Sequence, residues 1–271
     1  MRKQILIFAL SLLLIPVCRV VAVPIQEPQL SEDEIKRFLL NAKVIAKKVS
    51  NKGITNTLRL TLSDGKITHD ASFQSIDERR SKFEGMAGGV ELNFVDSYKY
   101  NIAAFELAKL VGLGDMVPVT VLRKYEGKSG SLSWWLPVTL DELDRQKKKI
   151  SPHDVEAYNR QMHKQRVFAE LVYDMDRNLT NILYSSEWHM WMIDFCRAFR
   201  LFHDLKTPKN LEKCERRLFE NLRTLDRAEL AEKTKGFLTR PEVDGVMARR
   251  DKIVKLFEKL IAEKGEKEVL Y

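Results

Sequence analysis

The fold of this 271-residue chain is decided by the stretch Asp174-Met175-Asp176-Arg177-Asn178-Leu179-Thr180-Asn181-Ile182-Leu183, together with Ile193-Asp194-Phe195 downstream. A polar loop is followed by two short apolar runs, and the second run ends in an acidic residue. Before the loop, Ser151-Pro152 predicts the start of a helix that runs toward Tyr173. The apolar runs at 182–184 and 188–193 predict two short strands around a turn. The polar side chains therefore lie between a helix and two strands.

Three of these polar side chains suit phosphoryl transfer from a nucleotide. The reaction needs a carboxylate that orients the acceptor hydroxyl and takes its proton. It also needs an amide oxygen and a second carboxylate that hold magnesium against the phosphates. Asp176 and Asn181, five residues apart as in protein-kinase catalytic loops, can supply the first two groups, and Asp194 can supply the third. The alternative is that these residues only make turns and cap helices, because Asp and Asn are common in loops.

The rest of the chain predicts an α+β fold with strands mainly in its first half. We expect a helix that begins at the capping residue Ser31 and ends at 51–53, then a β-hairpin that turns at 63–66. The next predicted elements are a loop at 79–89, a helix at 98–113 that is apolar on more than one side, and strands at 117–122 and 127–136. The second half is mainly helical, with predicted helices at 151–173, 210–225, and from Thr239-Arg240-Pro241 toward Lys264.

These motifs occur in an order that resembles the protein-kinase-like superfamily. The loop and Ile193-Asp194-Phe195 look like the catalytic and metal-binding loops of phosphatidylinositol kinases and of HipA-type bacterial kinases. The first half is similar to the secretory-pathway kinases that phosphorylate casein-like proteins in the Golgi. The pieces that match their layout are residues 60–65, Phe73-Gln74, Ile102-Ala103-Ala104-Phe105, Val111-Gly112-Leu113 and Val117-Pro118-Val119.

The resemblance covers residues 55–200 and implies a bilobal kinase-like fold. It implies a small antiparallel-sheet lobe at 50–136 and a larger helical lobe at 137–271, preceded by a helical extension at 23–49. It further implies ATP or a related nucleotide and Mg or Mn as cofactors. In that reading Asp176 is the catalytic base, and Asn181 and Asp194 bind the metal.

Two departures from the family concern the nucleotide site. The phosphate-binding lysine falls at Gln74, and its helix glutamate partner falls at Asn101. The double change removes a cation and an anion together, so neither charge is left unpaired. The two amides can hydrogen-bond to each other, but they supply no positive charge to a phosphate. Candidate substitute cations are Lys66, Lys82 and Lys99, and the alternative for each is a solvated surface lysine.

A third departure is Cys196, which stands where the protein-kinase motif has glycine and lacks that residue's backbone freedom. Cys196 and Cys214 could form a disulfide, although two small buried residues are the preferred interpretation. Arg197 and Arg200 either meet a phosphate or an acidic acceptor, or pair with nearby carboxylates.

The first residues predict export. Arg2 and Lys3 precede an uncharged run of 13 residues, Ile5 to Val17, and Val20-Val21-Ala22 suits signal peptidase, so we interpret residues 1–22 as a secretory signal. The alternative is an uncleaved membrane anchor. Cleavage lowers the net charge of +8 by three, to +5. The destination is the periplasm, the extracellular space or a secretory-pathway lumen. Nucleic acid is not an expected partner, because the charges are mixed along the chain.

Three functions fit this sequence. The first is an exported, magnesium-dependent phosphotransferase that moves phosphate from a nucleotide to an unknown hydroxyl acceptor on a protein or small molecule. The second is a pseudokinase that binds a nucleotide or a protein partner without catalysis. The third, a general exported surface-binding protein, requires the loop pattern to be accidental.

Overall fold

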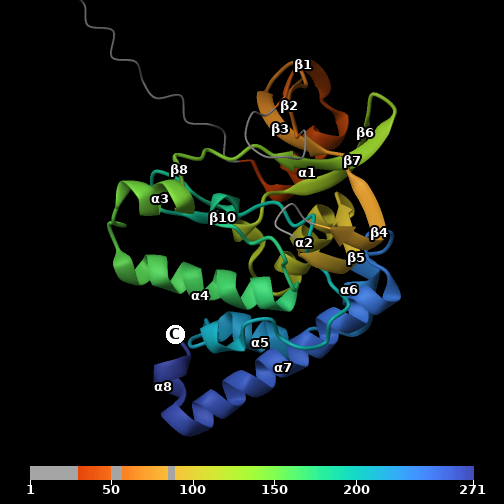
Figure 1. Cartoon of the computed structure of the whole chain (residues 1–271). Coiled ribbons are helices and arrows are strands. Elements are labelled where there is room, and N and C mark those ends of the chain that lie inside the picture. The colour runs from red at the N-terminus through yellow and green to blue at the C-terminus, as the bar shows by residue number, and fades with distance from the viewer. Residues whose placement is uncertain (1–29, 50–56, 85–88) are drawn as a thin grey trace, which may run out of the picture. The chain divides into compact units, whose positions relative to one another are not determined.

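The computed structural model describes residues 30–49, 57–84 and 89–271, and within these ranges it has the expected bilobal α+β architecture. The predicted secretory signal, with Cys18, lies outside the described residues. Residues 31–271 form one compact unit. In Figure 1, strands β1, β2 and β3 lie on one side of helix α2, and helices α4, α5 and α7 lie on the other. No helix in the described ranges is long and apolar enough to cross a bilayer.

The small lobe is built on a five-stranded antiparallel sheet with the order β1-β2-β3-β7-β6. Its strands are β1 (Lys43–Val49), β2 (Leu58–Ser63), β3 (Thr68–Gln74), β6 (Thr120–Tyr125) and β7 (Lys128–Trp134). Helix α1 (Glu32–Asn41) covers one face. Side chains alternate along a strand, so Leu60, Leu62 and Phe73 pack against α1 in one apolar cluster. Gln74 and Ser131, which pair across β3 and β7, therefore lie on the opposite, polar face.

The polar face of the sheet is turned toward helix α2 (Lys99–Leu110). Asn101 of α2 donates its side-chain amide to Oε1 of Gln74 and to Oγ of Ser131. The helix is buried on more than one side, as its sequence predicts, because Ala103, Ala104, Phe105 and Leu107 are all inaccessible to solvent. It therefore links the sheet to the core of the larger lobe.

The larger lobe contains six helices in the described residues and a small three-stranded sheet with the order β10-β9-β8. The helices are α3 (Glu142–Lys148), α4 (Val155–Leu171), α5 (Arg216–Thr224), α6 (Arg227–Lys233), α7 (Arg240–Lys264) and α8 (Glu266–Val269). The strands are β8 (Leu140–Asp141), β9 (Ile182–Tyr184) and β10 (Met190–Met192). Helix α7 begins as predicted, with a capping box formed by Thr239 and Glu242 and a proline in its first turn.

Two segments differ from the sequence prediction. The first helix ends at Asn41, and Lys43–Val49, which we expected to continue it, is strand β1. Arg123 of β6 donates hydrogen bonds to the carbonyl groups of Leu39 and Ala42, and β1 pairs with β2 along its length. Tertiary pairing thus overrides the helical periodicity of this segment.

The second difference lies at 79–89, which we expected to be a loop. Residues 79–84 belong to strand β4 (Asp77–Glu84), which pairs antiparallel with β5 (Val90–Ser97). Strand β4 is exposed along nearly its whole length. Its sequence therefore lacks the alternation of apolar and polar residues that would predict a strand. Backbone pairing and the stacked rings of Phe83 and Phe94 hold the two strands together. Helix α4 also begins later than predicted, capped by Asp154 instead of Ser151.

Candidate active site

Arg177 holds together the two loops that carry the predicted catalytic residues. Its Nε donates to the buried carboxylate of Asp174 at 2.7 Å. Its Nη1 donates to the carbonyl oxygens of Asn181 at 3.0 Å and Ile193 at 2.6 Å. The guanidinium also lies 4.4 Å from the centre of the Phe195 ring. One largely buried side chain therefore fixes the backbone around Asp176, Asn181 and Asp194.

The backbone brings Asn181 beside the residue that precedes Asp194. The amide of Ile193 donates to the carbonyl of Asn181 at 3.0 Å, and β9 and β10 pair directly after Asn181 and before Ile193. The amide nitrogen of the Asn181 side chain donates to the carbonyl of Asp176 at 3.1 Å, which directs its nitrogen back into the loop. The amide oxygen of Asn181 remains as the group that can coordinate a cation.

Asp194 adopts a left-handed backbone conformation, with φ at 56°. This region is costly for a residue other than glycine, and such residues gather at functional sites. Burial raises the pKa of Asp194, and the neighbouring Asp176 carboxylate raises it further, while Cys196 and Arg177 act in the opposite direction. Cys196 does not have a positive φ. Cysteine can therefore stand where the protein-kinase motif has glycine without straining the backbone at this position.

Gln74 and Asn101, the two amides at the positions where the family resemblance predicts a lysine and a glutamate, are hydrogen-bonded to each other. Nδ2 of Asn101 lies 2.5 Å from Oε1 of Gln74, as the sequence indicated. The other side-chain atom of Asn101, Oδ1, accepts the backbone N–H of Phe195 at 2.7 Å. The Cys196 thiol contacts both amides, at 3.4 Å from Oε1 of Gln74 and 3.3 Å from Nδ2 of Asn101. An uncharged network thus connects β3, α2 and the Asp194 segment.

Three carboxylates influence one another at this site. Burial raises the pKa of Asp96, on β5, and the negative charges of Asp194 and Asp176 contribute to the increase. Oδ1 of Asp96 is buried and has no hydrogen-bond partner within the described residues. Carboxylates and an amide oxygen are the ligands that Mg²⁺ and Mn²⁺ prefer, so this donor set fits a hard divalent cation.

The described residues contain no preassembled group of three or more His, Cys, Asp or Glu side chains that would hold a metal. The predicted ligand set differs from such a group, because it combines one residue of this kind, Asp194, with the side-chain amide of Asn181.

The candidate substitute cations lie in different surroundings. Lys99 pairs with Asp77 at 2.7 Å, and Lys82 pairs with Glu84 at 2.6 Å on the exposed strand β4. Lys66 is exposed at the turn between β2 and β3. Arg197 and Arg200 both contact the carboxylate of Glu91, which favours the interpretation that they pair with a nearby acid.

A cation that the sequence analysis missed, Arg59, lies on the polar face of the sheet. Its Nε donates to Oδ2 of Asp70 at 2.6 Å, and its guanidinium lies 4.2 Å from the centre of the Trp135 ring. The alternation of Leu58, Leu60 and Leu62 could have predicted the orientation of Arg59. If the leucines face the apolar cluster, the residue between Leu58 and Leu60 lies on the face that carries Gln74. Its two partners could not be read from that pattern.

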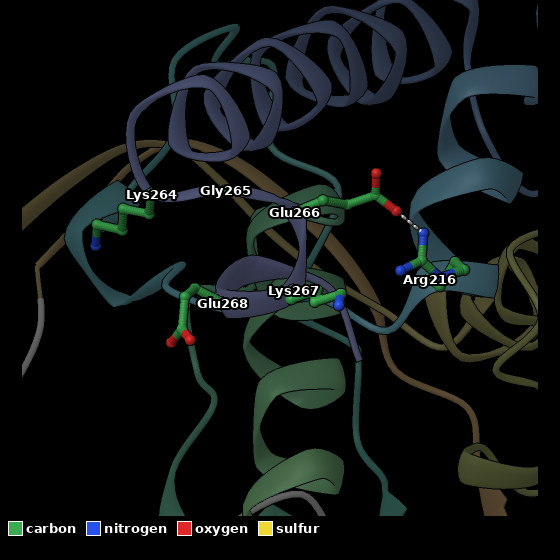
Figure 2. A pocket seen from close by; sticks show the side chains of 6 residues that line it. All are labelled: Arg216, Lys264, Gly265, Glu266, Lys267 and Glu268. Atoms are coloured by element: carbon green, nitrogen blue, oxygen red, sulfur yellow. Dashed lines mark hydrogen bonds and ion pairs between the residues drawn. The ribbon is translucent and has the colours of Figure 1, made fainter.

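A pocket elsewhere on the chain does not contain these residues. It is lined by Arg216 and by residues 264–268, where α7 passes into α8 (Figure 2). Arg216 and Glu266 form an ion pair across it. Both side chains are about half exposed, so the pair is weakly stabilising and marks no chemical centre.

Neither the Cys196 thiol nor the Cys214 thiol forms a disulfide, and both are buried. This confirms the preferred interpretation of two small buried residues. Burial raises the pKa of Cys196 well above its usual range, and it raises the pKa of Cys214 to about 12. Neither thiol has the depressed pKa that a nucleophilic cysteine needs.

Comparison with solved structures identifies the class of fold. A structure of the hydra Fam20 protein with sugar superimposes with a TM-score of 0.65 and 14% identity, covering 88% of this chain and 91% of that one. The Golgi casein kinase with Mn and ADP bound gives 0.63 and 13%, covering 88% and 78%. The Helicobacter pylori proinflammatory kinase CtkA gives 0.52 and 10%, covering 83% and 98%.

The chain therefore has a protein-kinase-like fold. Within that class it resembles the Fam20-type kinases, in agreement with the resemblance noted from the sequence. No protein-family model matches the chain, and a search of curated proteins finds no match.

Proposed function

We propose that this chain is an exported, divalent-metal-dependent phosphotransferase that uses ATP or a related nucleotide. The observation that carries the proposal is the set of bonds made by Arg177. By binding the carbonyl groups of Asn181 and Ile193, this residue holds the Asp176 loop against the segment that leads into Asp194. The Mn and ADP named with the Golgi casein kinase structure support the same pair of cofactors.

The roles of the residues follow from their chemistry. Asp176 accepts the proton of the acceptor hydroxyl, as the new phosphorus–oxygen bond forms and the bond to the leaving nucleotide diphosphate breaks. Asn181 and Asp194 would hold Mg²⁺ or Mn²⁺, which supplies positive charge to the phosphates when bound. Gln74 and Asn101 border the nucleotide and position the Asp194 segment by hydrogen bonding. The acceptor is a hydroxyl of unknown identity.

The proposal is tested by measuring nucleotide binding and turnover together. Thermal unfolding of the chain is followed with ATP and Mg²⁺ or Mn²⁺, and release or transfer of phosphate is measured under the same conditions. We expect ATP with metal to stabilise the protein, and Asp176→Ala and Asp194→Ala to lower turnover by about 100-fold or more. Asp33→Ala, an exposed carboxylate in α1, is the control and should leave turnover unchanged.

The uncharged pair at Gln74 and Asn101 favours a second candidate, a pseudokinase that binds nucleotide or a protein partner without transfer. Losing the cation that faces the phosphates removes a large part of the stabilisation of the transition state. Stabilisation by ATP and metal, with no turnover above that of Asp194→Ala, would support this candidate. Absence of both stabilisation and turnover would rule out the phosphotransferase and the nucleotide-binding form of the pseudokinase, and would leave binding of a protein partner as the candidate.

A further inference from the structure

The polar face of the five-stranded sheet carries an arginine beside Gln74. Arg59 of β2 pairs with Ser72 of β3, and Gln74 lies two residues further along β3 on the same face. Nε2 of Gln74 also contacts Oγ1 of Thr57, two residues before Arg59, at 3.4 Å. Arg59 and Gln74 are therefore diagonal neighbours in an antiparallel pair, a separation of roughly 7–8 Å.

The guanidinium of Arg59 is held by two partners. It lies over the ring of Trp135, 4.2 Å from the ring centre, and its Nε donates to Oδ2 of Asp70 at 2.6 Å. The ring supports the flat side of the guanidinium, and the ion pair fixes its orientation. The side chain of Arg59 is nevertheless 42% exposed, so it remains accessible to a ligand.

The backbone that follows β7 has few free hydrogen-bonding groups beside this arginine. The amide of Trp135 donates to the carbonyl of Asp70 at 3.1 Å, and its carbonyl oxygen lies 2.9 Å from Nε2 of the His69 ring. The amides at positions 138 and 139 also donate within the chain, and Pro137 has no N–H. A flat ligand at this place is therefore held mainly by stacking, because the backbone offers little to read the edge of its ring.

The same face of the sheet carries an excess of positive charge. Lys48 of β1 pairs with Arg59 from the other side, so its side chain lies on this face. Lys48 is exposed and forms no ion pair with a residue in the described ranges. Asp70 is the acid on this face along the described strands β1, β2 and β3, and it balances one of the two cations. The remaining charge favours an anionic ligand.

A planar ring joined to negative charge fits these features, and a nucleotide has both. We propose that Arg59, supported by Trp135, is the stacking platform for the base of the bound nucleotide, and that this platform accepts adenine and guanine nearly equally. A guanidinium or an indole stacks on any base, because every base has a π face. The inference rests on the proposed function and deepens it, since it assigns the base to β2 and makes stacking the source of its affinity.

The test is titration calorimetry of the full chain with ATP, GTP and ADP in the presence of Mg²⁺. We expect the wild type to bind ATP and GTP with dissociation constants within about threefold of each other. Arg59→Lys keeps the charge and loses the planar group, so it should weaken all three nucleotides by a common factor of about five or more. The matched control is Arg80→Lys, at an exposed arginine of β4 that pairs with Glu78, and it should leave all three affinities unchanged.

A second variant tests the support of the guanidinium. Trp135→Leu removes the ring beneath Arg59 and should weaken ATP and GTP by similar factors. Thermal unfolding without nucleotide shows whether each variant is folded, and binding is compared only between variants with a cooperative transition. ATP affinity in Arg59→Lys equal to that of the wild type would overturn the inference. A loss that is clearly larger for ATP than for ADP would also overturn it, because the arginine would then contact the terminal phosphate.

These outcomes are separate from those that decide the proposed function. Wild-type affinity for ATP more than about tenfold above that for GTP would show hydrogen-bonded readout of the base and would sink the platform alone. Turnover of ATP that persists unchanged in Arg59→Lys would likewise leave the phosphotransferase standing without the platform. A wild type that binds none of the three nucleotides would remove the nucleotide from the proposed function as well.

Discussion

Asn101 donates a 2.5 Å hydrogen bond to Oε1 of Gln74, and this bond joins α2 to β3 at the two positions where the resemblance noted from the sequence predicts a lysine–glutamate ion pair. Both partners are uncharged, so the bond connects the two elements without placing a cation in the proposed nucleotide site. The Oδ1 atom of Asn101 extends the connection to the backbone of Phe195. The contact is thus a structural link between the sheet, the helix and the Asp194 segment.

Restoring the charged pair should strengthen nucleotide binding. The double variant Gln74→Lys with Asn101→Glu introduces a cation for the phosphates together with its orienting anion. We expect tighter binding of ATP with Mg²⁺, by about tenfold or more, equivalent to about 1.4 kcal/mol. Titration with a fluorescent ATP analogue measures the affinity. The single variant Asn101→Glu adds an anion without a cation and should weaken binding, and unchanged affinity in the double variant would show that position 74 does not face the phosphates.

Truncation of Asn101 should destabilise the fold. Asn101→Ala leaves the buried amide of Phe195 without its acceptor and removes the partner of Gln74. Leaving one buried polar group unsatisfied costs about 1–3 kcal/mol. Urea denaturation measures the loss in free energy of unfolding. Asn41→Ala, at the exposed end of α1, is the control and should lower the free energy of unfolding by less than about 0.5 kcal/mol. Equal losses in the two variants would show that the hydrogen bonds of Asn101 do not stabilise the fold.

Returning position 196 to the glycine of the protein-kinase motif should not stabilise this chain. Because Cys196 has no positive φ, glycine brings no relief of strain and adds freedom to the unfolded chain. We expect Cys196→Gly to lower the free energy of unfolding by about 0.5–1 kcal/mol, measured by chemical denaturation. Cys196→Ala retains the restricted backbone and serves for comparison. Greater stability of the glycine variant would indicate a left-handed backbone at position 196.

Glu142 should make the larger lobe sensitive to acid. This buried residue of α3 accepts hydrogen bonds from Arg145 at 2.7 Å and from Tyr184 of β9 at 2.9 Å. Burial acts to raise the pKa of Glu142, but the hydrogen bonds from Arg145, Gln146 and Tyr184 outweigh it and hold the pKa below its ordinary value of 4.5.

A depressed carboxyl pKa contributes stability that is present above the unfolded value and is lost as the pH falls through the folded value. At neutral pH, Glu142→Gln should lower the free energy of unfolding by about 1–3 kcal/mol. The difference from the wild type should shrink as the pH falls below 4.5. Thermal unfolding at a series of pH values measures this difference. A difference that stays constant down to acid denaturation would show that the charge of Glu142 contributes nothing.

The sequence of a single segment was enough to predict the elements that are defined by signals within that segment. Helix α7 followed from its capping residues, and β9 and β10 followed from two short apolar runs around a turn. The candidate catalytic loop could be predicted because Asp176 and Asn181 lie in one segment and are separated by the interval that kinase loops use. The hydrogen bond between Gln74 and Asn101 could also be predicted, because the family pattern places these two positions in contact.

Residues far apart in the chain account for what the local pattern could not show. Strand β1 forms instead of a longer helix because β2 offers a backbone partner and Arg123 caps the end of α1. The side chains of β4 are exposed along nearly the whole strand, so its pairing with β5 leaves no alternation of apolar residues in that segment of the sequence. Asp96 comes near Asp194 only because the end of β5 pairs with the backbone of Cys196. Local periodicity reports which face of a segment is buried, whereas the neighbour that covers it is chosen by the free energy of the whole packed chain.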